Sequence, residues 1–419
     1  MLRAMRGMSV AVTAAATVAL TATSAAPAPR PVTERVTLSA TGEQLSEGGF
    51  SPDVSADGRY AVFDSDQSDL VPGDTNGQHD IFVRDLRRGT VERVDVASDG
   101  TQADVGSSGA AISADGRYVT FRSMATTLVD WPSPPYYPSD VYVHDRRTGR
   151  TERISVGADG GTGGAFDQPA VSADGRYVAF VAQESRMEAG NTGGRLAAYV
   201  ADRRTGEVRR VSNRTRPEWS VQEVDLSADG GRLAYVHRHP RGGPGELMVV
   251  DLRTGGEEQA NVFPPSMPAD ISPSALTLSA DGRYVSFHQP EPSVAGHTWE
   301  TYVRDLREDS ARRIGLDGEG EGEPAGVPLL SPDGRYLAYT WATTTVGGEQ
   351  AQNVYVRDLR GGQTRRVTRA VMGGPLTDGV SVPVSFARGN GLLALGSSSA
   401  QLVPGDTNGL LDGFVVRLH

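Results

Sequence analysis

Two nearly identical loops carry oxygen-bearing side chains at a spacing that resembles a calcium-binding loop. Both follow the pattern Leu-Val-Pro-Gly-Asp-Thr-Asn-Gly-x-x-Asp, and their polar residues are Asp74, Asn76 and Asp80 in the first loop and Asp406, Asn408 and Asp412 in the second. In calcium-binding loops, carboxylate and amide oxygens surround the ion around a tight glycine turn. Calcium takes about six to eight oxygen ligands, however, and each of these loops offers only three side chains. Two interpretations stay open: structural turns or calcium sites.

Aromatic side chains form a second group suited to ligand binding, because exposed rings stack on sugars or hold a peptide. All four tryptophans and three further aromatic residues fall in or beside segments that we assign below to one set of loops. These residues are Trp131, Tyr136, Tyr137, Phe166, Trp219, Trp299 and Trp341. The alternative interpretation is that the rings only cap the hydrophobic core between neighbouring sheets.

The chain lacks two residue types that carry much of protein chemistry. It contains no cysteine, which excludes disulfides, thiolate nucleophiles, iron–sulfur clusters and cysteine-ligated zinc. It contains no lysine, so Schiff-base catalysis and a phosphate-binding P-loop lack their essential residue. Because arginine codons are GC-rich, this usage indicates a high-GC bacterial genome. The histidines show no metal-ligand spacing beyond His237 and His239, which we assign to a strand end entering a loop.

The net charge of the chain and its N-terminal segment limit the classes of partner that it can bind. The 419-residue chain has a formal net charge of −11, whereas nucleic acids and anionic membranes select basic surfaces. Arg3 and Arg6, a short apolar stretch and then small residues are typical of a Sec-type signal peptide, here residues 1–28. A Pro- and Ala-rich linker, 29–33, follows. We expect a secreted, extracytoplasmic monomer that binds no nucleic acid and does not insert into the membrane after cleavage.

A repeated hexamer shows which elements must position these side chains. Ser-Ala-Asp-Gly-Arg-Tyr occurs at 55–60, 113–118, 172–177 and 279–284, with variants at 227–232 and 331–336 and a degenerate copy at 387–391. Asp-Gly between apolar runs predicts a hairpin, since glycine accepts positive φ. The demands of this turn explain the repeated aspartates better than a ring of cation sites does. The chain is therefore built from seven repeats, spaced 52 to 59 residues apart.

Each repeat contains four strand-like runs. In the third repeat these runs are 169–172, 177–180, 198–200 and 208–212. The first three are apolar on both faces and the fourth is more charged, as in a small sheet packed between two neighbours with one outer strand. A ring of such sheets is a β-propeller. We predict an all-β fold, a seven-bladed β-propeller of four-stranded antiparallel blades over residues 34–419.

The two ends of this domain complement each other. The last repeat stops after its third strand, 413–417, while a run matching the fourth strand, 34–38, precedes the first hexamer. We expect the N-terminal strand to complete the last blade, because this closes the ring and removes an exposed sheet edge. The two Asp-x-Asn loops then belong to the adjacent blades seven and one.

The hexamer followed by Val-Ala-Phe resembles the repeat of TolB-like and related WD-type bacterial propellers, whose usual form is Ser-Pro-Asp-Gly-Lys. Residues 331–335, Ser-Pro-Asp-Gly-Arg, are the closest copy. The resemblance implies a propeller over nearly the whole predicted mature chain, without the α/β domain that precedes the propeller of TolB. Propeller-bearing peptidases have a similar repeat, but their hydrolase motif Gly-x-Ser-x-Gly does not occur in this sequence.

Function in such a ring is expected on one face. The hexamer turns lie on one face, which we call the turn face. The loops between second and third strands and between blades lie on the other, which we call the loop face. The irregular segments with the seven aromatic candidates belong to the loop face, where binding residues concentrate. The acidic run Glu319–Glu323 adds negative potential there and favours a cationic partner.

The first strand of each blade lines the central channel, and the acidic residues predicted there are Asp53, Asp167, Glu223 and Asp225. Glycan hydrolysis needs two carboxylates at a defined separation, and the sequence identifies no such pair. We predict a secreted, non-catalytic propeller that binds a cell-envelope protein or glycan through its loop face and requires no cofactor. The alternatives are an extracellular polysaccharide-cleaving enzyme, a glycoside hydrolase or lyase with its site at the channel, and a purely structural spacer.

Overall fold

The computed structural model describes most of the predicted propeller. The described residues are 33–130, 139–190, 194–212, 219–238, 244–261, 272–293, 296–319, 322–344, 350–387, 389 and 391–418. The predicted signal peptide, 1–28, and most of the predicted linker lie outside them. Within the compact unit Pro31–His419, the described chain is nearly all β, and its one helix is α1 (Glu184–Met187). No helix in the described part has the length and apolar character needed to cross a bilayer.

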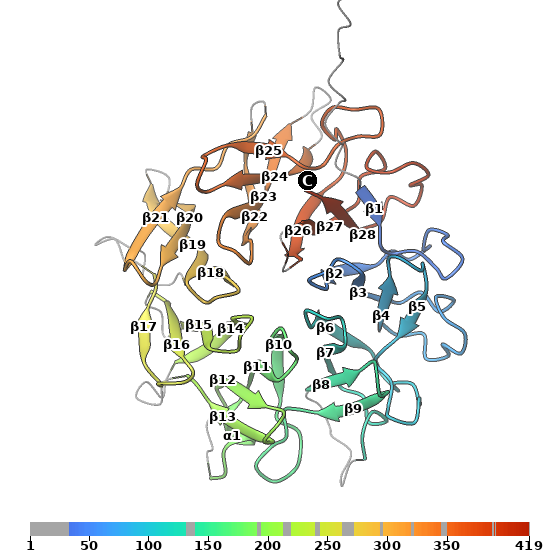
Figure 1. Cartoon of the computed structure of the whole chain (residues 1–419), viewed down its shortest axis with the longest axis vertical. Helices are drawn as coiled ribbons and strands as arrows, with labels where there is room; N and C mark the ends of the chain where they lie inside the picture. The colour runs from blue at the N-terminus through green and yellow to red at the C-terminus, as the bar shows by residue number, and fades with distance from the viewer. Residues whose placement is uncertain are drawn as a thin grey trace, which may run out of the picture. The chain divides into compact units, whose positions relative to one another are not determined.

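Seven four-stranded antiparallel sheets follow one another in a ring, which confirms the predicted seven-bladed β-propeller (Figure 1). Blade 1 contains β2 (Phe50–Val54), β3 (Tyr60–Ser65), β4 (Asp80–Asp85) and β5 (Val91–Arg93), and blade 2 contains β6 (Ser107–Ile112), β7 (Tyr118–Ser123), β8 (Asp140–Asp145) and β9 (Arg150–Arg153). Blade 3 contains β10 (Ala165–Val171), β11 (Tyr177–Gln183), β12 (Leu196–Asp202) and β13 (Glu207–Arg210), and blade 4 contains β14 (Ser220–Leu226), β15 (Arg232–Arg238), β16 (Glu246–Asp251) and β17 (Glu257–Gln259).

The last three blades include the longest strands of the ring. Blade 5 contains β18 (Ser274–Leu278), β19 (Tyr284–Ser293), β20 (Gly296–Asp305) and β21 (Ser310–Ile314), and blade 6 contains β22 (Gly322–Leu330), β23 (Tyr336–Thr344), β24 (Gln350–Asp358) and β25 (Thr364–Arg366). Blade 7 contains β26 (Ser381–Phe386), β27 (Leu392–Ser397), β28 (Asp412–Arg417) and β1 (Thr33–Arg35). In each blade the first strand is innermost, apart from the chain-end strand β1, which is outermost (Figure 1).

The N-terminal strand closes the ring as predicted. β1 pairs antiparallel with β28, with Glu34 opposite Val415, and the Val36 N–H donates to the Gly413 carbonyl at 2.8 Å. The strand begins at Thr33, one residue before the predicted start, and ends at Arg35 because the chain then turns, so that Leu38 bridges to Gln44. The first and last described segments therefore share one sheet, and blade 7 presents no unpaired third strand.

Apolar side chains on both faces of the middle strands fill the spaces between neighbouring blades. All six residues of β4 are buried, as expected for a strand packed on both sides. In five blades an aromatic residue of the second strand stacks on its partner in the third, with ring centroids 5.6 to 6.1 Å apart. These cross-strand pairs, which stabilise antiparallel sheets, are Phe63–Phe82, Phe121–Tyr142, Phe180–Tyr199, Phe287–Tyr302 and Tyr339–Tyr355.

The hexamer forms a capped turn and also joins the blades. In blade 1 the Ser55 hydroxyl donates to Asp57 Oδ1 at 2.8 Å, and the same oxygen accepts the Arg59 N–H at 3.0 Å. Arg59 forms an ion pair with Asp85 at the end of β4 at 2.7 Å, and its guanidinium lies 4.7 Å from the ring centroid of Tyr60. These contacts account for the aspartate as a turn residue, as predicted, and pair the arginine with an acidic neighbour.

The hexamer alanine has a role that the sequence pattern did not suggest. Around the ring, the N–H of this residue donates to the carbonyl of its counterpart in the next blade at 2.7 to 3.0 Å. The donor–acceptor pairs are Ala56–Ala114, Ala114–Ala173, Ala173–Ala228, Ala228–Ala280 and Ala280–Pro332. Pro332 has no N–H to continue the series. Five of the blade junctions are therefore joined by backbone hydrogen bonds at the channel edge of the turn face.

Candidate functional site

The structure places four of the seven aromatic candidates at strand ends on the loop face. Phe166 is the second residue of β10, and Trp219 directly precedes β14, whereas the hexamer turns follow the other ends of these strands. Trp299 lies near the start of β20 and Trp341 near the end of β23, which are also loop-face ends. The remaining three candidates, Trp131, Tyr136 and Tyr137, lie outside the described residues.

The four rings differ in how far they are accessible. Trp299 is 45% exposed and Phe166 is 38% exposed, so both present apolar surface to solvent. Trp219 is half-buried, and its ring centroid lies 5.1 Å from that of His237. Trp341 is only 8% exposed. Only the first two therefore combine a large apolar ring with substantial exposure.

Trp341 is covered by the segment that enters blade 6. Its indole ring packs over Gly318 and Gly322, where a Cβ atom on either residue would collide with the ring. It belongs to a buried group with Tyr339 and Tyr355. This arrangement corresponds to the core-capping alternative, and as a binding surface this ring is not available in the structure.

In the first Asp-x-Asn loop, an arginine from the outer strand lies between the two aspartates. Arg93 Nη1 is 3.1 Å from Asp80 Oδ2 and 3.5 Å from Asp74 Oδ1. Gln102 Nε2 donates to Asp74 at 2.8 Å and to Asp80 at 3.1 Å, while Asn76 Nδ2 donates to Asp80 Oδ1 at 3.0 Å. Protein donors thus already satisfy the oxygens that were considered as calcium ligands.

The second loop repeats this arrangement with residues from the other end of the chain. Arg35 of β1 pairs with Asp406 at 2.7 Å and approaches Asp412 at 3.5 Å, and Gln44 Nε2 donates to Asp406 at 2.9 Å. The Asn408 amide bonds instead to the Leu45 carbonyl at 2.9 Å. The loop of blade 7 is therefore held by the N-terminal segment, which links it to ring closure.

Structural turns and calcium sites both stay open as interpretations of these loops. Burial raises the pKa of Asp74 and of Asp412, as expected for carboxyl groups that lack full solvation. Within the described part of the chain, no group of three or more histidine, aspartate or glutamate side chains is arranged to hold a metal ion. The contacts in both loops agree with structural turns in which an arginine supplies the positive charge.

The two loops differ at one buried position. In blade 7 the Thr37 hydroxyl donates to Asp412 Oδ1 at 2.8 Å. The corresponding residue of blade 1 is Asp95, which is fully buried, accepts the Ile81 N–H at 3.1 Å and faces Asp80. Burial and the carboxylate of Asp80 raise the pKa of Asp95 well above its usual value. Blade 1 therefore holds a buried pair of carboxyl groups where blade 7 has a hydroxyl and a carboxylate.

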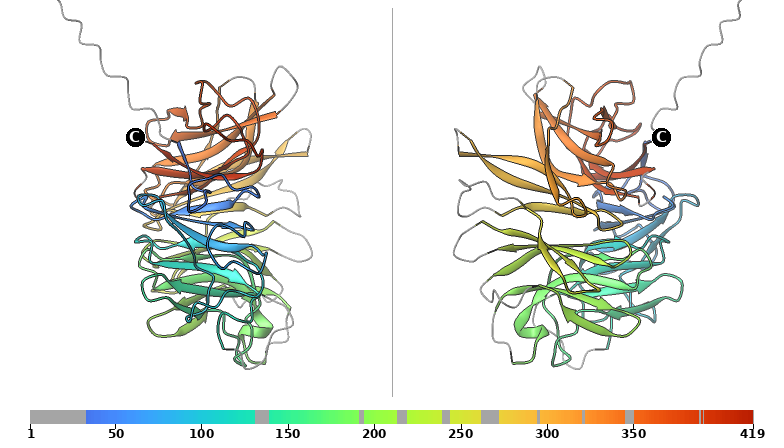
Figure 2. Two further views of the ribbon diagram at one scale, coloured as in Figure 1. Left: turned by 90° about the vertical axis from the view of Figure 1, so that its right-hand side faces the viewer. Right: turned by 60° about the vertical axis from the view of Figure 1, so that its left-hand side comes forward.

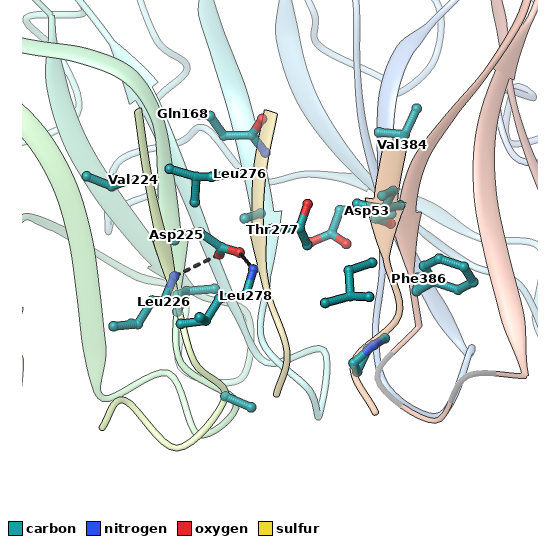
Figure 3. A pocket seen from close by; sticks show the side chains of 18 of the residues that line it. Asp53, Gln168, Val224, Asp225, Leu226, Leu276, Thr277, Leu278, Val384 and Phe386 are labelled. Atoms are coloured by element: carbon teal, nitrogen blue, oxygen red, sulfur yellow. Dashed lines mark hydrogen bonds between the residues drawn. The ribbon is translucent and has the colours of Figure 1, made fainter. Parts of the chain in front are cut away.

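A cavity of about 450 Å³ lies in the central channel (Figure 3). All seven inner strands contribute residues to its walls. The four acidic residues predicted to face the channel line it, as predicted: Asp53, Asp167, Glu223 and Asp225. The remaining lining is largely apolar and includes Leu276, Val384 and Phe386, and no lining residue is basic. The lining also includes Ala228 and Ala280 of the hexamers, so the cavity reaches the turn face.

Two of the channel acids join neighbouring blades. Asp225 accepts the N–H of Leu226 in its own strand and that of Leu278 in the next inner strand, both at 2.7 Å (Figure 3). Asp53 occupies the same position in blade 1 and accepts the Val54 N–H at 2.8 Å and the Ile112 N–H at 2.9 Å. Both carboxylates are thus satisfied by backbone donors and act as links between blades.

Glu223 also contacts the next blade, but the negative charge of Asp167 opposes its ionisation. Its two carboxylate oxygens accept the N–H groups of Ala275 and Leu276 at 3.1 and 3.0 Å. Burial, followed by the charge of Asp167, raises the pKa of Glu223 to about 7 despite these hydrogen bonds. The carboxyl group of Glu223 therefore gains or loses a proton near neutral pH.

Asp167 is held in a backbone conformation that disfavours an aspartate. Its φ is +61° within a bulge of β10 between Phe166 and Ala170. The corresponding bulges of blades 2 and 6 have glycines with positive φ, Gly109 and Gly326, and this region carries no penalty for glycine. Burial raises the pKa of Asp167. Blade 3 thus places a carboxyl group in the channel where blades 2 and 6 use glycine.

Sequence comparisons identify no relative, since no family model and no curated protein matches the chain. Among solved structures, oligogalacturonate lyase from Vibrio parahaemolyticus is similar with a TM-score of 0.58 and 11% identity, over 93% of this chain and 97% of that one. The propeller domain of the Trilobed protease from Pyrococcus furiosus has a TM-score of 0.54 at 14% identity, over 88% and 95%. TolB from Acinetobacter baumannii has a TM-score of 0.40 at 17% identity, over 68% and 58%.

These similarities show the propeller fold alone. At 11 to 14% identity, the active site or ligand of a similar protein cannot be assigned to this chain. The propeller fold that the sequence resemblance implied is present, and membership of the TolB-like family stays a prediction. The arginine and glutamine that hold the Asp-x-Asn loops were missed in the sequence, although Arg35 to Gln44 and Arg93 to Gln102 have the same separation.

Proposed function

We propose that this chain is a secreted, monomeric, non-catalytic propeller that binds a cell-envelope protein through its loop face. The observation that carries the proposal is Trp299, a tryptophan with 45% of its surface exposed, on a ribbon that extends beyond the rest of blade 5. Tryptophan is enriched among the residues that dominate binding energy at protein interfaces. The predicted signal peptide supports export, although it lies outside the described residues.

The ribbon consists of the outer halves of β19 and β20. β21 pairs only with residues 301–305 of β20, and the pairing of β18 with β19 ends at His288. Residues 289–293 and 296–300 are therefore paired with each other and with no further described strand. The side views show this hairpin projecting from the ring (Figure 2). Because a two-stranded ribbon is only marginally stable by itself in water, its length is better explained by binding than by stability.

Charge near the ribbon favours a partner with a basic patch. Glu300 is next to Trp299 in β20, and Glu291 lies on the paired strand, where it accepts the Tyr302 hydroxyl. Asp317 and Glu319, in the segment that leads to blade 6, pair with Arg357 and Arg366, and their side chains remain 65% and 62% exposed. Aromatic and acidic groups together attract cationic side chains. A glycan is the alternative ligand, because an exposed tryptophan also stacks on sugar rings.

Capture from the native envelope fraction tests this proposal. Immobilised wild-type protein is compared with Trp299→Ala and with Val156→Ala, a control that removes another apolar side chain, 40% exposed, in the segment between β9 and β10. We expect Trp299→Ala to capture at least tenfold less material than the wild type and Val156→Ala to capture as much as the wild type. Protease treatment of the fraction should abolish capture. Equal capture by the two variants contradicts the proposal, and capture that resists protease but not glycosidases identifies a glycan instead.

Cleavage of polysaccharide is a second candidate, favoured by one observation. Glu223 has a pKa of about 7 in the channel, which suits a general acid or base. Oligogalacturonate lyase, one of the structurally similar proteins, acts by its name on an acidic oligosaccharide, and a cavity lined by four carboxyl groups repels such a ligand. Release of reducing or unsaturated sugar ends from envelope and plant polysaccharides, lost in Glu223→Gln, establishes catalysis; no release by the wild type excludes it for those substrates.

A further inference from the structure

The channel cavity has the size and rigidity of a ligand pocket. Its volume of about 450 Å³ falls within the range of about 300 to 1,000 Å³ typical of small-molecule sites. Its walls come from inner strands that are joined blade to blade by the hexamer alanines and by Asp53 and Asp225. The pocket is thus formed before any ligand arrives, which lowers the entropic cost of binding.

The charges in the cavity do not balance within its walls. Asp53 and Asp225 each accept two backbone N–H groups, and these four hydrogen bonds stabilise their negative charge. Asp167 and Glu223 lie on the inner strands β10 and β14 of adjacent blades. The charge of Asp167 raises the cost of ionising Glu223, whereas Arg122 offsets part of the cost at Asp167, and no arginine or histidine belongs to the lining. A positive charge between them removes this penalty without a change in the fold.

Aromatic rings on the same two strands point to the same class of ligand. Phe166 immediately precedes Asp167 on β10, and Trp219 precedes Glu223 by four residues on the β14 side. Both rings lie at the loop-face ends of these strands, one exposed and one half-buried. Aromatic faces attract organic cations. The two rings therefore lie at the loop-face ends of the strands that bring Asp167 and Glu223 to the cavity, outside its lining.

We propose that the channel cavity binds an organic monocation, an alkylammonium or guanidinium group, with its charge at Asp167 and Glu223. The apolar wall formed by Leu276, Val384 and Phe386 suits the hydrocarbon stem of such a group and not a hydrated metal ion. A divalent metal needs about six oxygen ligands in a regular arrangement, and the described residues contain no metal-binding cluster. The source is a free amine or a basic side chain of a polypeptide.

Calorimetric titration with small probes tests this site. The probes are n-butylamine, n-butylguanidine, and the N-acetylated, C-amidated tripeptides Gly-Lys-Gly and Gly-Arg-Gly, with the equally blocked Gly-acetyl-Lys-Gly, acetate and Ca²⁺ as comparisons. We expect the four cationic probes to bind and acetylated lysine and acetate to fail. Tighter binding of the tripeptides than of the free amines identifies a basic side chain as the natural source, and the reverse order identifies a small amine. No binding of any cationic probe at millimolar concentration overturns the proposal, as does Ca²⁺ binding that displaces them.

Two variants assign binding to the named carboxyl groups. Asp167→Gly removes the carboxyl group and gives blade 3 the residue type of blades 2 and 6, so its fold is retained. Glu223→Gln removes the second charge, and Glu207→Gln, an exposed glutamate on β13, is the control. We expect each channel variant to weaken amine binding at least tenfold and the control to leave it unchanged. Unchanged binding in Asp167→Gly overturns the proposal, and this outcome does not depend on the stability of Glu223→Gln. Trp299→Ala should retain amine binding, so this site and the loop-face proposal fail separately.

Discussion

Replacing Asp95 with threonine should stabilise the protein at neutral pH. The residue is fully buried and accepts the Ile81 N–H at 3.1 Å, a contact that a hydroxyl also provides. In blade 2 the Ser155 hydroxyl accepts the Val141 N–H at 2.9 Å and donates to Asp140 at 2.6 Å. A hydroxyl thus satisfies both neighbours, whereas an aspartate does so only when it carries a proton.

The magnitude follows from the linkage between proton binding and folding. Burial and Asp80 raise the pKa of Asp95 above its unfolded value, so the folded state binds more protons than the unfolded state. The stability contributed by the protonated form is fully present below the unfolded pKa of about 3.9 and is lost as pH rises towards the folded pKa. Within this window the wild type loses about 1.4 kcal/mol per pH unit relative to Asp95→Thr.

Urea unfolding of wild type and variant between pH 4 and pH 8 measures this difference. The free energy of unfolding of Asp95→Thr should exceed that of the wild type by an amount that grows as the pH rises. The reverse change, Thr37→Asp in blade 7, places two carboxyl groups next to each other there and should give the opposite trend. Parallel stability profiles for wild type and Asp95→Thr would refute the assignment of a buried carboxyl pair to blade 1.

Three further predictions follow from the contacts described above. Because arginines already lie between the loop aspartates, a chelator should leave the melting temperature unchanged, whereas a calcium ion at ~100 times its Kd would add ~2.7 kcal/mol. Trp341→Ala, at an 8% exposed site, should cost about 3–5 kcal/mol in urea unfolding, whereas Trp299→Ala should cost less than about 1 kcal/mol. Burial lowers the pKa of His288 to about 4, so between pH 6.5 and pH 4 the unfolded state binds a proton that the folded state does not, and stability falls with pH. Relative to His288→Gln, the wild type should lose about 2 kcal/mol between pH 7 and pH 5, and equal losses would contradict this.

The ring could be predicted from the sequence because the same local physics recurs seven times. Asp57 and Gly58 make a turn that any chain with this pattern forms, and the apolar faces of the following strand require a sheet on either side. Closure was predictable because residues 34–38 match a strand that the last repeat lacks. The channel acids were predictable too, since strand order alone decides which strand is innermost.

The environment of each candidate could not be predicted, because it depends on distant partners. Trp341 is buried only because Gly318 and Gly322 let the chain cross its ring, and no local pattern shows this. In the sequence the Asp-x-Asn loops resemble calcium loops. Strand pairing places Arg93 between the two carboxylates of the first loop, and the sequence alone does not show this contact. The backbone conformation of Asp167 arises from a bulge, whose position along an inner strand varies among the blades.

Site-specific photocrosslinking tests the central claim, which is recognition of an envelope protein through the loop face. A photoreactive residue is placed at position 299 on the ribbon and, in a second protein, at position 360 on an exposed turn between β24 and β25. After irradiation in the native envelope fraction, position 299 should form a specific adduct with a protein and position 360 should not. Adducts from position 360 alone, or equal adducts from both positions, would contradict the account.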